Sequence, residues 1–258
     1  MAHVLAVANQ KGGVGKTTSS INLAASLAIN GHSTLLVDVD PQANASSGVG
    51  AHVQNDGVSV YDCLIRSVPA ERAIVATSLQ NLSVLPATPD LAGAEIELIQ
   101  VESRELVLKR TLATSLSRFE YIILDCPPAF GLLTINALVA ATGVVIPMQC
   151  EYYAMEGLGR LMASIDRVRQ SLNPTLDLTG IVLTMYDARN SLARQVADEV
   201  RSHFKQKVFS AVIPRNVTLA EAPSYGRPAV LYNASSSGAQ AYLAVAKELL
   251  QHGKESAG

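Results

Sequence analysis

Short apolar runs alternate along the chain with longer segments in which apolar residues recur every three or four positions. The short aliphatic runs predict β-strands at Val4–Ala8, Thr34–Val39, Leu82–Leu85, Tyr121–Leu124, Val144–Pro147, Leu178–Thr184 and Val208–Phe209. The segments with helical spacing predict α-helices at Thr17–Asn30, Val60–Arg66, Asp90–Leu116, Thr134–Ala141, Glu156–Ser171, Ser191–His203 and Ser237–Gln251. Because several strands are apolar throughout, both of their faces are expected to be covered. This order predicts an α/β fold with a mostly parallel, doubly wound β-sheet flanked by helices, in which ligands bind beyond the carboxyl ends of the strands.

The composition is consistent with one large hydrophobic core. The chain has 258 residues, of which 48% are apolar and 16% charged, so it can bury a substantial interior. No linker rich in Gly, Ser or Pro divides it, and no repeat or low-complexity tract is visible. We therefore expect a single domain over residues 1–258.

The cysteines and the amino-terminal segment bear on the compartment. Cys63, Cys126 and Cys150 are isolated, and the five histidines are scattered, so neither a disulfide framework nor a zinc site is indicated. The chain begins almost at once with a predicted strand, and no run approaches 18 apolar residues. These features predict a cytoplasmic protein with buried free thiols.

The loop after the first predicted strand has the composition of a phosphate-binding loop. In order, its residues are Lys11, Gly12, Gly13, Val14, Gly15, Lys16, Thr17 and Thr18. Glycines allow backbone N–H groups to approach phosphate oxygens, and the dipole of the helix that follows also faces the anion. Lys16 is expected to neutralise the β- and γ-phosphates, and the Thr17 hydroxyl to ligate Mg²⁺. Gln10 stands where the common pattern has glycine, and Lys11 is one lysine more than this geometry requires.

This loop resembles the deviant Walker A motif of the ParA/MinD group of P-loop ATPases. In that group the early lysine, here Lys11, reaches across a nucleotide-sandwich dimer to the phosphates of the partner subunit. The resemblance implies binding of ATP or ADP with Mg²⁺, ATP hydrolysis assisted by Lys11 and Lys16, and an ATP-dependent homodimer. The alternative is a surface turn that happens to be rich in Gly and Lys, and the strand before it and the helix after it disfavour that alternative.

Acidic residues follow two further predicted strands. Asp38 and Asp40 are two positions apart, so both point to the same side if the strand continues through them. The resemblance assigns Asp40, the second aspartate of Asp-x-Asp-Pro-Gln, to orienting the attacking water, whereas Asp38 supports either the Mg²⁺ shell or the loop. Asp125 ends an apolar strand, as in a Walker B motif that holds Mg²⁺ through water. The alternative, which is disfavoured even without the phosphate loop, is that Asp38 and Asp40 only cap the end of a strand.

Two later loops complete the predicted nucleotide pocket. In ParA-like proteins the corresponding loops wall the adenine, which implies that Met185 and Pro214 cover the faces of the base and that Asn216 bonds to its edge. The resemblance, close to chromosomal ParA proteins often called Soj, continues from Asn216 through Pro228. The chain departs from the pattern at Thr218 and in the Ser-rich segment 233–237, where relatives frequently carry basic residues that bind DNA.

The charge distribution bears on DNA binding. The whole chain carries a net charge of −2, which gives no general attraction to a polyanion. Between Arg189 and Arg227, however, seven Lys or Arg residues face three acids, a balance of +4. A weak basic patch that is doubled in a dimer can hold DNA without sequence preference. The candidate residues are Arg189, Arg194, Arg201 and Lys205, with a solvated helix face as the alternative.

Together these features predict a nucleotide switch that segregates a chromosome or plasmid on the nucleoid with a ParB-type (Spo0J-type) partner. The alternatives are a MinD-like or orphan ParA-like ATPase that positions another cargo, a metabolic P-loop enzyme related to dethiobiotin synthetase, and a scaffold that bridges an iron–sulfur cluster through Cys126. The last predicted helix has few basic residues, which disfavours membrane binding by a MinD-like helix. The other two thiols show no pattern that supports a cluster.

Overall fold

The computed structural model describes residues 2–53 and 57–255, and one seven-stranded sheet forms the centre of this part of the chain. Its strands are β1 (His3–Val7), β2 (Thr34–Asp38), β3 (Val75–Ala76), β4 (Leu82–Leu85), β5 (Tyr121–Asp125), β6 (Gly143–Gln149) and β7 (Asp177–Thr184). Their spatial order is β3-β4-β2-β5-β1-β6-β7, and only the β3–β4 pair is antiparallel. The mostly parallel α/β fold predicted from the sequence is therefore confirmed.

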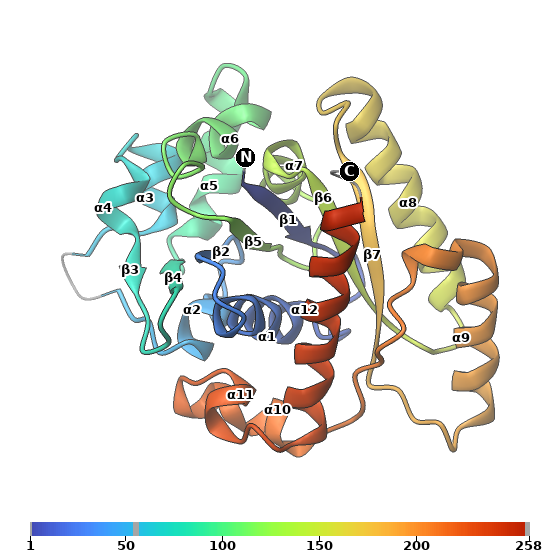
Figure 1. The fold of residues 1–258 in the computed structure, drawn as a ribbon. Helices are drawn as coiled ribbons and strands as arrows, with labels where there is room; N and C mark the ends of the chain where they lie inside the picture. Colours follow the sequence, from blue (N-terminus) through green and yellow to red (C-terminus); the bar gives the residue numbers. More distant parts are fainter. Residues whose placement is uncertain (1, 54–56, 256–258) are drawn as a thin grey trace.

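Helices cover both faces of this sheet (Figure 1). The longer ones are α1 (Lys16–Ile29), α5 (Leu91–Glu97), α7 (Leu132–Ala140), α8 (Ala154–Ser171), α9 (Ser191–Phe204) and α12 (Ser237–Glu255). The shorter ones are α2 (Asn44–Gly48), α3 (Val60–Ile65), α4 (Ala70–Ala73), α6 (Val107–Leu112), α10 (Val217–Glu221) and α11 (Ala229–Tyr232). Among the described residues, none of these helices is both long and apolar enough to cross a membrane.

Alternate residues of the strands feed two separate hydrophobic cores. In β1, Val4 and Ala6 pack with residues of α3, α5, α6, α7, α8 and α9, while Leu5 and Val7 pack with residues of α1 and α12. Successive side chains of a strand point to opposite faces, so a strand that is buried on both faces must be apolar at every position. This geometry explains the continuous apolar runs of the sequence.

Two predicted elements are wrong. Val208–Phe209 is not a strand but an isolated bridge: Val208 pairs with Ile181, and the Phe209 N–H donates to the Ile181 carbonyl at 3.0 Å. The N–H groups of Ser210 and Ala211, which come next, donate to the Glu248 carboxylate of α12 at 2.7 and 2.8 Å, so the pairing with β7 does not continue through them.

The predicted long helix Asp90–Leu116 is also broken. The chain forms α5, a 3-10 turn at Leu98–Gln100, a second at Arg104–Leu106, and α6. Ser103 adopts a left-handed φ of 53°, and the Asn136 side chain accepts from the Leu108 N–H at 3.0 Å and donates to the Arg104 carbonyl at 2.9 Å. The side-chain amide of Asn136, in α7, thus forms hydrogen bonds with backbone groups that would be paired with each other in one continuous helix.

The three cysteines are free and buried, and burial raises the pKa of each thiol, to about 12 for Cys63 and about 11 for Cys150. Because the thiolate is the reactive form, native protein at pH 8 should react with Ellman's reagent at well under one thiol per chain over minutes. Three thiols should react once guanidinium unfolds the chain. Rapid reaction of one thiol in native protein would contradict this burial.

Candidate functional site

The phosphate-binding loop joins β1 to α1 at the carboxyl edge of the sheet. Gly13 and Gly15 have left-handed φ values of 73° and 86°, which side chains with a Cβ rarely adopt. Gly15 caps α1, and its carbonyl accepts from the Ser19 N–H at 2.8 Å. The backbone of Lys11–Gly15 is therefore wound tightly in front of the first turn of α1, where the helix dipole attracts anions.

Lys16, the first residue of α1, is buried although it carries an ammonium group. Its Nζ donates to the Lys11 carbonyl at 3.1 Å, so the side chain folds back across its own loop. Burial lowers the pKa of Lys16, and the negative charges of Asp125 and Asp40 oppose that shift. An incompletely compensated ammonium of this kind is suited to a phosphate, which would supply the missing negative charge.

The sheet register places two carboxylates side by side. Asp38 ends β2 and Asp125 ends β5, and the two residues pair across the adjacent strands. Asp38 Oδ2 accepts from the Ser46 N–H at 2.8 Å and from its hydroxyl at 2.7 Å, and Asp38 Oδ1 accepts from the Asp40 N–H at 3.2 Å. Of the two roles that the sequence left open for Asp38, these contacts match support of the loop.

Asp125 has one satisfied and one unsatisfied oxygen. Its Oδ1 accepts from the Ser20 hydroxyl at 2.7 Å, whereas the buried Oδ2 accepts no hydrogen bond among the described residues. Burial raises the pKa of Asp125, the charge of Asp38 raises it further, and the contacts with Ser20 and Thr17 oppose the rise.

A buried carboxylate oxygen without a partner, beside the Thr17 side chain, fits the outer coordination of a Mg²⁺ ion. In this arrangement Thr17 would supply a hydroxyl ligand and Asp125 would hold water in the coordination shell. When bound, the ion neutralises charge on the phosphate oxygens.

Asp40 lies at the mouth of the same site. It is 7% exposed, and its Oδ1 accepts from the Gln42 N–H at 2.9 Å. Its charge is close enough to oppose the lowering of the Lys16 pKa. The carboxylate is therefore held by its own loop and has a second oxygen to offer, and its role toward water stays a prediction.

Lys11 does not point at Lys16 but pairs with the carboxylate of Glu151, which follows β6. The side chains of Lys11 and Glu151 are 51% and 45% exposed, so the pair lies at the surface. The N–H of Lys11 also donates to Asn9 Oδ1 at 3.0 Å, and Asn9 Nδ2 donates to the Pro147 carbonyl at 2.8 Å. The sheet thus fixes the backbone of Lys11 while its ammonium stays accessible.

The two loops predicted to wall the adenine lie together. Tyr186 and Pro214 form a parallel bridge, and the Tyr186 N–H donates to the Ile213 carbonyl at 2.9 Å. Met185 has a left-handed φ of 49°, a strained conformation for a residue with a side chain. Asn216, however, caps α10: its Oδ1 accepts from the Leu219 N–H at 3.2 Å and its Nδ2 donates to Ser237 Oγ at 2.9 Å. Contacts of these residues with a base stay predictions.

The four predicted DNA-binding residues separate into two pairs along α9. Near its start, the 91% exposed Arg189 pairs with Asp187 at 2.9 Å, and Arg194 donates to the Ala188 carbonyl at 2.5 Å. At its end, Arg201 and Lys205 line a shallow depression with Glu248. Arg194 and Arg201 are seven residues apart, which places them about 10 Å apart along α9 and on nearly the same side of the helix, so the basic residues follow the helix as a strip.

Several residues of the site escaped prediction from the sequence. They are Asn9, Ser20, Glu151 and Thr184, whose hydroxyl donates to the Val14 carbonyl at 2.8 Å. Ser20 lies one helical turn after Lys16, a spacing that places it on the same face of α1 and provided a signal. Thr184 and Glu151 come close only through the fold.

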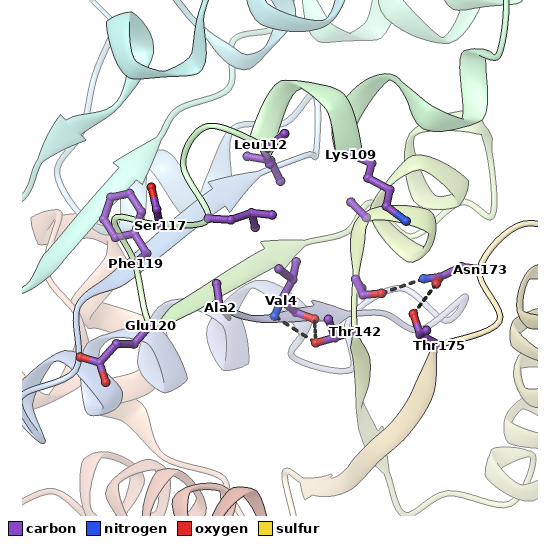
Figure 2. Close-up of a pocket in the computed structure, with 14 residues that line it drawn as sticks. Ala2, Val4, Lys109, Leu112, Ser117, Phe119, Glu120, Thr142, Asn173 and Thr175 are labelled. Atoms are coloured by element: carbon purple, nitrogen blue, oxygen red, sulfur yellow. Dashed lines mark hydrogen bonds between the residues drawn. The ribbon is translucent and has the colours of Figure 1, made fainter. Parts of the chain in front are cut away.

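A separate cavity of about 660 Å³ lies at the opposite, amino ends of β1 and β6 (Figure 2). Its walls are largely apolar, with Leu112, Leu116 and Phe119 among the lining residues. Two of its polar residues are engaged by the protein itself: the Thr142 hydroxyl bonds to the backbone of Val4, and Asn173 Nδ2 donates to the Leu138 and Ala141 carbonyls. It has none of the phosphate-binding features found at the carboxyl edge.

Comparison with known proteins agrees with this geometry. A family model described as an AAA domain matches residues 2–178. The chain is 52% identical over 253 residues to the sporulation initiation inhibitor protein Soj of Bacillus subtilis, covering 98% of this chain and 100% of that protein. It is 51% identical over 251 residues to the chromosome partitioning protein ParA of Myxococcus xanthus, covering 97% of this chain and 89% of that protein. The chain belongs to the ParA/Soj family of P-loop ATPases.

Solved structures of similar proteins extend the ParA/Soj comparison. One is a protein of Mycobacterium smegmatis named cobyrinic acid a,c-diamide synthase, with bound ADP and magnesium: it is 40% identical, has a TM-score of 0.85, and the match covers 98% of this chain and 96% of that one. Another is the cell division ATPase MinD of Pyrococcus furiosus, which is 26% identical and has a TM-score of 0.81. That match covers 97% of this chain and 99% of the MinD chain. As a ParA/Soj partitioning ATPase, the chain uses ATP and Mg²⁺.

Proposed function

We propose that this chain is an ATP-dependent dimerisation switch, built as one domain over residues 1–258, that binds DNA non-specifically and drives segregation of a chromosome or plasmid in the cytoplasm. The observation that carries the proposal is the surface position of Lys11. Among the described residues its ammonium is held only by an exposed ion pair with Glu151, while Lys16 is buried beside Asp125. A lysine needed only for phosphate binding within its own subunit would have no reason to stay at the surface.

The residues of the site would act in the following order. The Gly12–Thr18 loop and Lys16 bind the phosphates of ATP, with Thr17 and Asp125 around Mg²⁺ and with Met185, Pro214 and Asn216 around the base. Lys11 leaves Glu151 and reaches the nucleotide of a second copy, so the γ-phosphate joins two subunits. Asp40 then orients a water for hydrolysis, which removes the joining group and releases the dimer.

DNA binding would follow from dimerisation. Each subunit contributes Arg189, Arg194, Arg201 and Lys205, and a dimer doubles their number on one surface. Because affinity rises with each phosphate that is neutralised, a patch too weak in one copy becomes effective in two. A ParB-type protein would bind the dimer and accelerate hydrolysis. A MinD-like or orphan ParA-like positioning role for another cargo is the second candidate, and the departure from basic residues at Thr218 favours it.

DNA binding is tested by electrophoretic mobility shift with a double-stranded fragment of arbitrary sequence. Wild type should shift the fragment with Mg²⁺ and ATP but not with ADP, and the affinity should fall steeply with salt. The double variant Arg201→Ala/Lys205→Ala removes four phosphate contacts per dimer. The negative slope of log K against log[salt] should therefore become shallower by roughly 3 to 4. Arg66→Ala, which removes an exposed arginine that follows α3 and pairs with Asp62, is the matched control. No binding at low salt with ATP would contradict the DNA role and favour another cargo surface.

A further inference from the structure

Helix α5 and the 3-10 turn Leu98–Gln100 that follows it carry two apolar stripes, although an amphipathic surface helix needs only one. The inward stripe is buried in the core and consists of Leu91, Ala94 and Leu98. A second stripe with the same spacing of three and four residues faces outward and consists of Ala92, Ile96 and Ile99. Ile96 is 72% exposed and Ile99 53%, and the chain continues into Val101, which is 39% exposed.

These four outward residues, Ala92, Ile96, Ile99 and Val101, form what we call the α5 ridge. Single exposed aliphatic side chains are common and need no explanation, whereas several on one short segment mark a candidate contact surface. Ile96 is among the most exposed large apolar side chains of the described residues. Keeping it in water forgoes the stabilisation that burial of an aliphatic side chain gives.

The segment of chain that carries the α5 ridge is acidic. Residues 90–105 hold five acids and one arginine, a balance of −4, whereas the whole chain is −2. Arg104 is already engaged by Glu105 at 3.1 Å and by the Ile99 carbonyl at 3.2 Å. Glu97 and Glu102 are exposed on either side of Ile99, and Tyr61 donates to Glu97 at 3.0 Å. A partner that covers this ridge must therefore be basic.

The same helix touches the loop that leads out of the catalytic site. Glu95 of α5 accepts from the N–H groups of Leu132 and Leu133 at 3.0 and 3.2 Å, and so caps α7. A Cβ at Gly131 would lie 2.5 Å from Glu95 Oε1, so glycine is needed for this approach. Helix α7 begins seven residues after Asp125, so a loop of six residues, 126–131, joins the end of β5 to the helix that Glu95 caps.

We propose that the α5 ridge docks a short amphipathic segment of a partner protein, with Lys or Arg flanking two or three aliphatic side chains, and that Glu95 transmits its arrival to the loop after Asp125. This inference rests on the proposed function, since it assigns a place to the partner that accelerates hydrolysis. A second copy of this chain fits poorly, because two α5 ridges face to face would bring their acids together.

Binding is tested with a synthetic 18-residue helical peptide that carries Leu on one face and Lys on the other, and with a matched peptide in which Glu replaces Lys. A Gln100→Cys variant labelled with an environment-sensitive fluorophore reports arrival at the ridge, since the three native thiols are buried. The Lys peptide should change the fluorescence and stimulate ATP hydrolysis, and the Glu peptide should do neither.

The location is tested by substitutions in the ridge. Ile96→Ser/Ile99→Ser should weaken binding of the Lys peptide by tenfold or more while ATP-dependent dimerisation is unchanged. Ile29→Ser is the matched control, because Ile29 is 44% exposed at the far end of α1. Equal binding by the ridge variant and wild type would overturn the proposal. Loss of dimerisation by the ridge variant would also overturn it, since the ridge would then be an interface between copies.

The transmission step is tested separately with Glu95→Gln, which keeps an acceptor oxygen but removes the charge at the cap of α7. This variant should bind the Lys peptide like wild type, yet the ratio of stimulated to basal hydrolysis should fall toward one. An unchanged ratio would overturn the role of Glu95. If wild type itself neither dimerises nor hydrolyses ATP, the proposed function fails; if it does both but ignores the peptide, only the docking inference fails.

Discussion

Replacing Asp40 by alanine is expected to slow ATP hydrolysis by about two orders of magnitude or more and to trap the protein as an ATP-bound dimer. A positioned carboxylate that orients or activates the attacking water typically contributes a factor of about 10² to 10⁴. The phosphate loop and Lys16 are untouched by the change, so binding of Mg²⁺ and ATP should persist. Because hydrolysis is the step that dissolves the dimer, blocking it should make the dimer accumulate.

The controls separate chemistry from folding. Asp40 also accepts a hydrogen bond from the Gln42 N–H, and losing it costs about 1 kcal/mol. Asp40→Asn keeps an acceptor in the same place, so it should restore the stability lost in Asp40→Ala but not the activity. Asp166→Ala, at an exposed aspartate of α8, should hydrolyse ATP at the wild-type rate. Wild-type turnover by Asp40→Asn, measured by phosphate release, would limit Asp40 to a structural role.

Replacing Lys11 by alanine is expected to abolish ATP-dependent dimerisation while nucleotide binding stays within a few-fold of wild type. In the structure the ammonium of Lys11 meets only Glu151 among the described residues, and both side chains are about half exposed. An exposed ion pair of this kind contributes about 0.2–1 kcal/mol, so it is readily exchanged for the phosphates of a partner. Its loss should change the melting temperature little.

Two variants sharpen this test of Lys11. Lys109→Ala removes an exposed lysine of α6 and should dimerise normally, which controls for the loss of a positive charge. Glu151→Gln removes the partner within the same chain and should leave dimerisation intact or strengthen it, since Lys11 is then free. Sedimentation velocity measures the outcome. If Lys11→Ala forms dimers at the ATP concentration at which the wild-type protein does, Lys11 has no role between subunits.

The sequence predicted the parts of the site that depend on local order. The strand–loop–helix unit around Lys16 needs only Gly13 and Gly15 in left-handed conformations and an apolar run on each side. Asp125 was identifiable because a buried strand must end in something polar at the carboxyl edge. Those signals lie within a few residues of one another, so no knowledge of the tertiary structure was needed.

Residues brought together only by the fold could not be predicted in the same way. The pairing of Asp38 with Asp125 depends on β2 lying next to β5, and the contact of Lys11 with Glu151 depends on β6. At Val208–Phe209 the pairing with β7 stops after one bridge, and the N–H groups of Ser210 and Ala211 that follow donate to Glu248 from another part of the chain. In each case the local structure depends on a side chain that is distant in sequence, and the hydrophobic pattern of a segment contains no information about such contacts.

The central claim is that Lys11 joins two subunits through the γ-phosphate, and light scattering after size exclusion tests it most directly. With Mg²⁺ and ATP, Asp40→Ala should elute with the mass of two 27.3-kDa chains, because hydrolysis no longer dissolves the dimer. The double variant Lys11→Ala/Asp40→Ala should elute with the mass of one chain under the same conditions. A double variant with the mass of two chains would contradict the account.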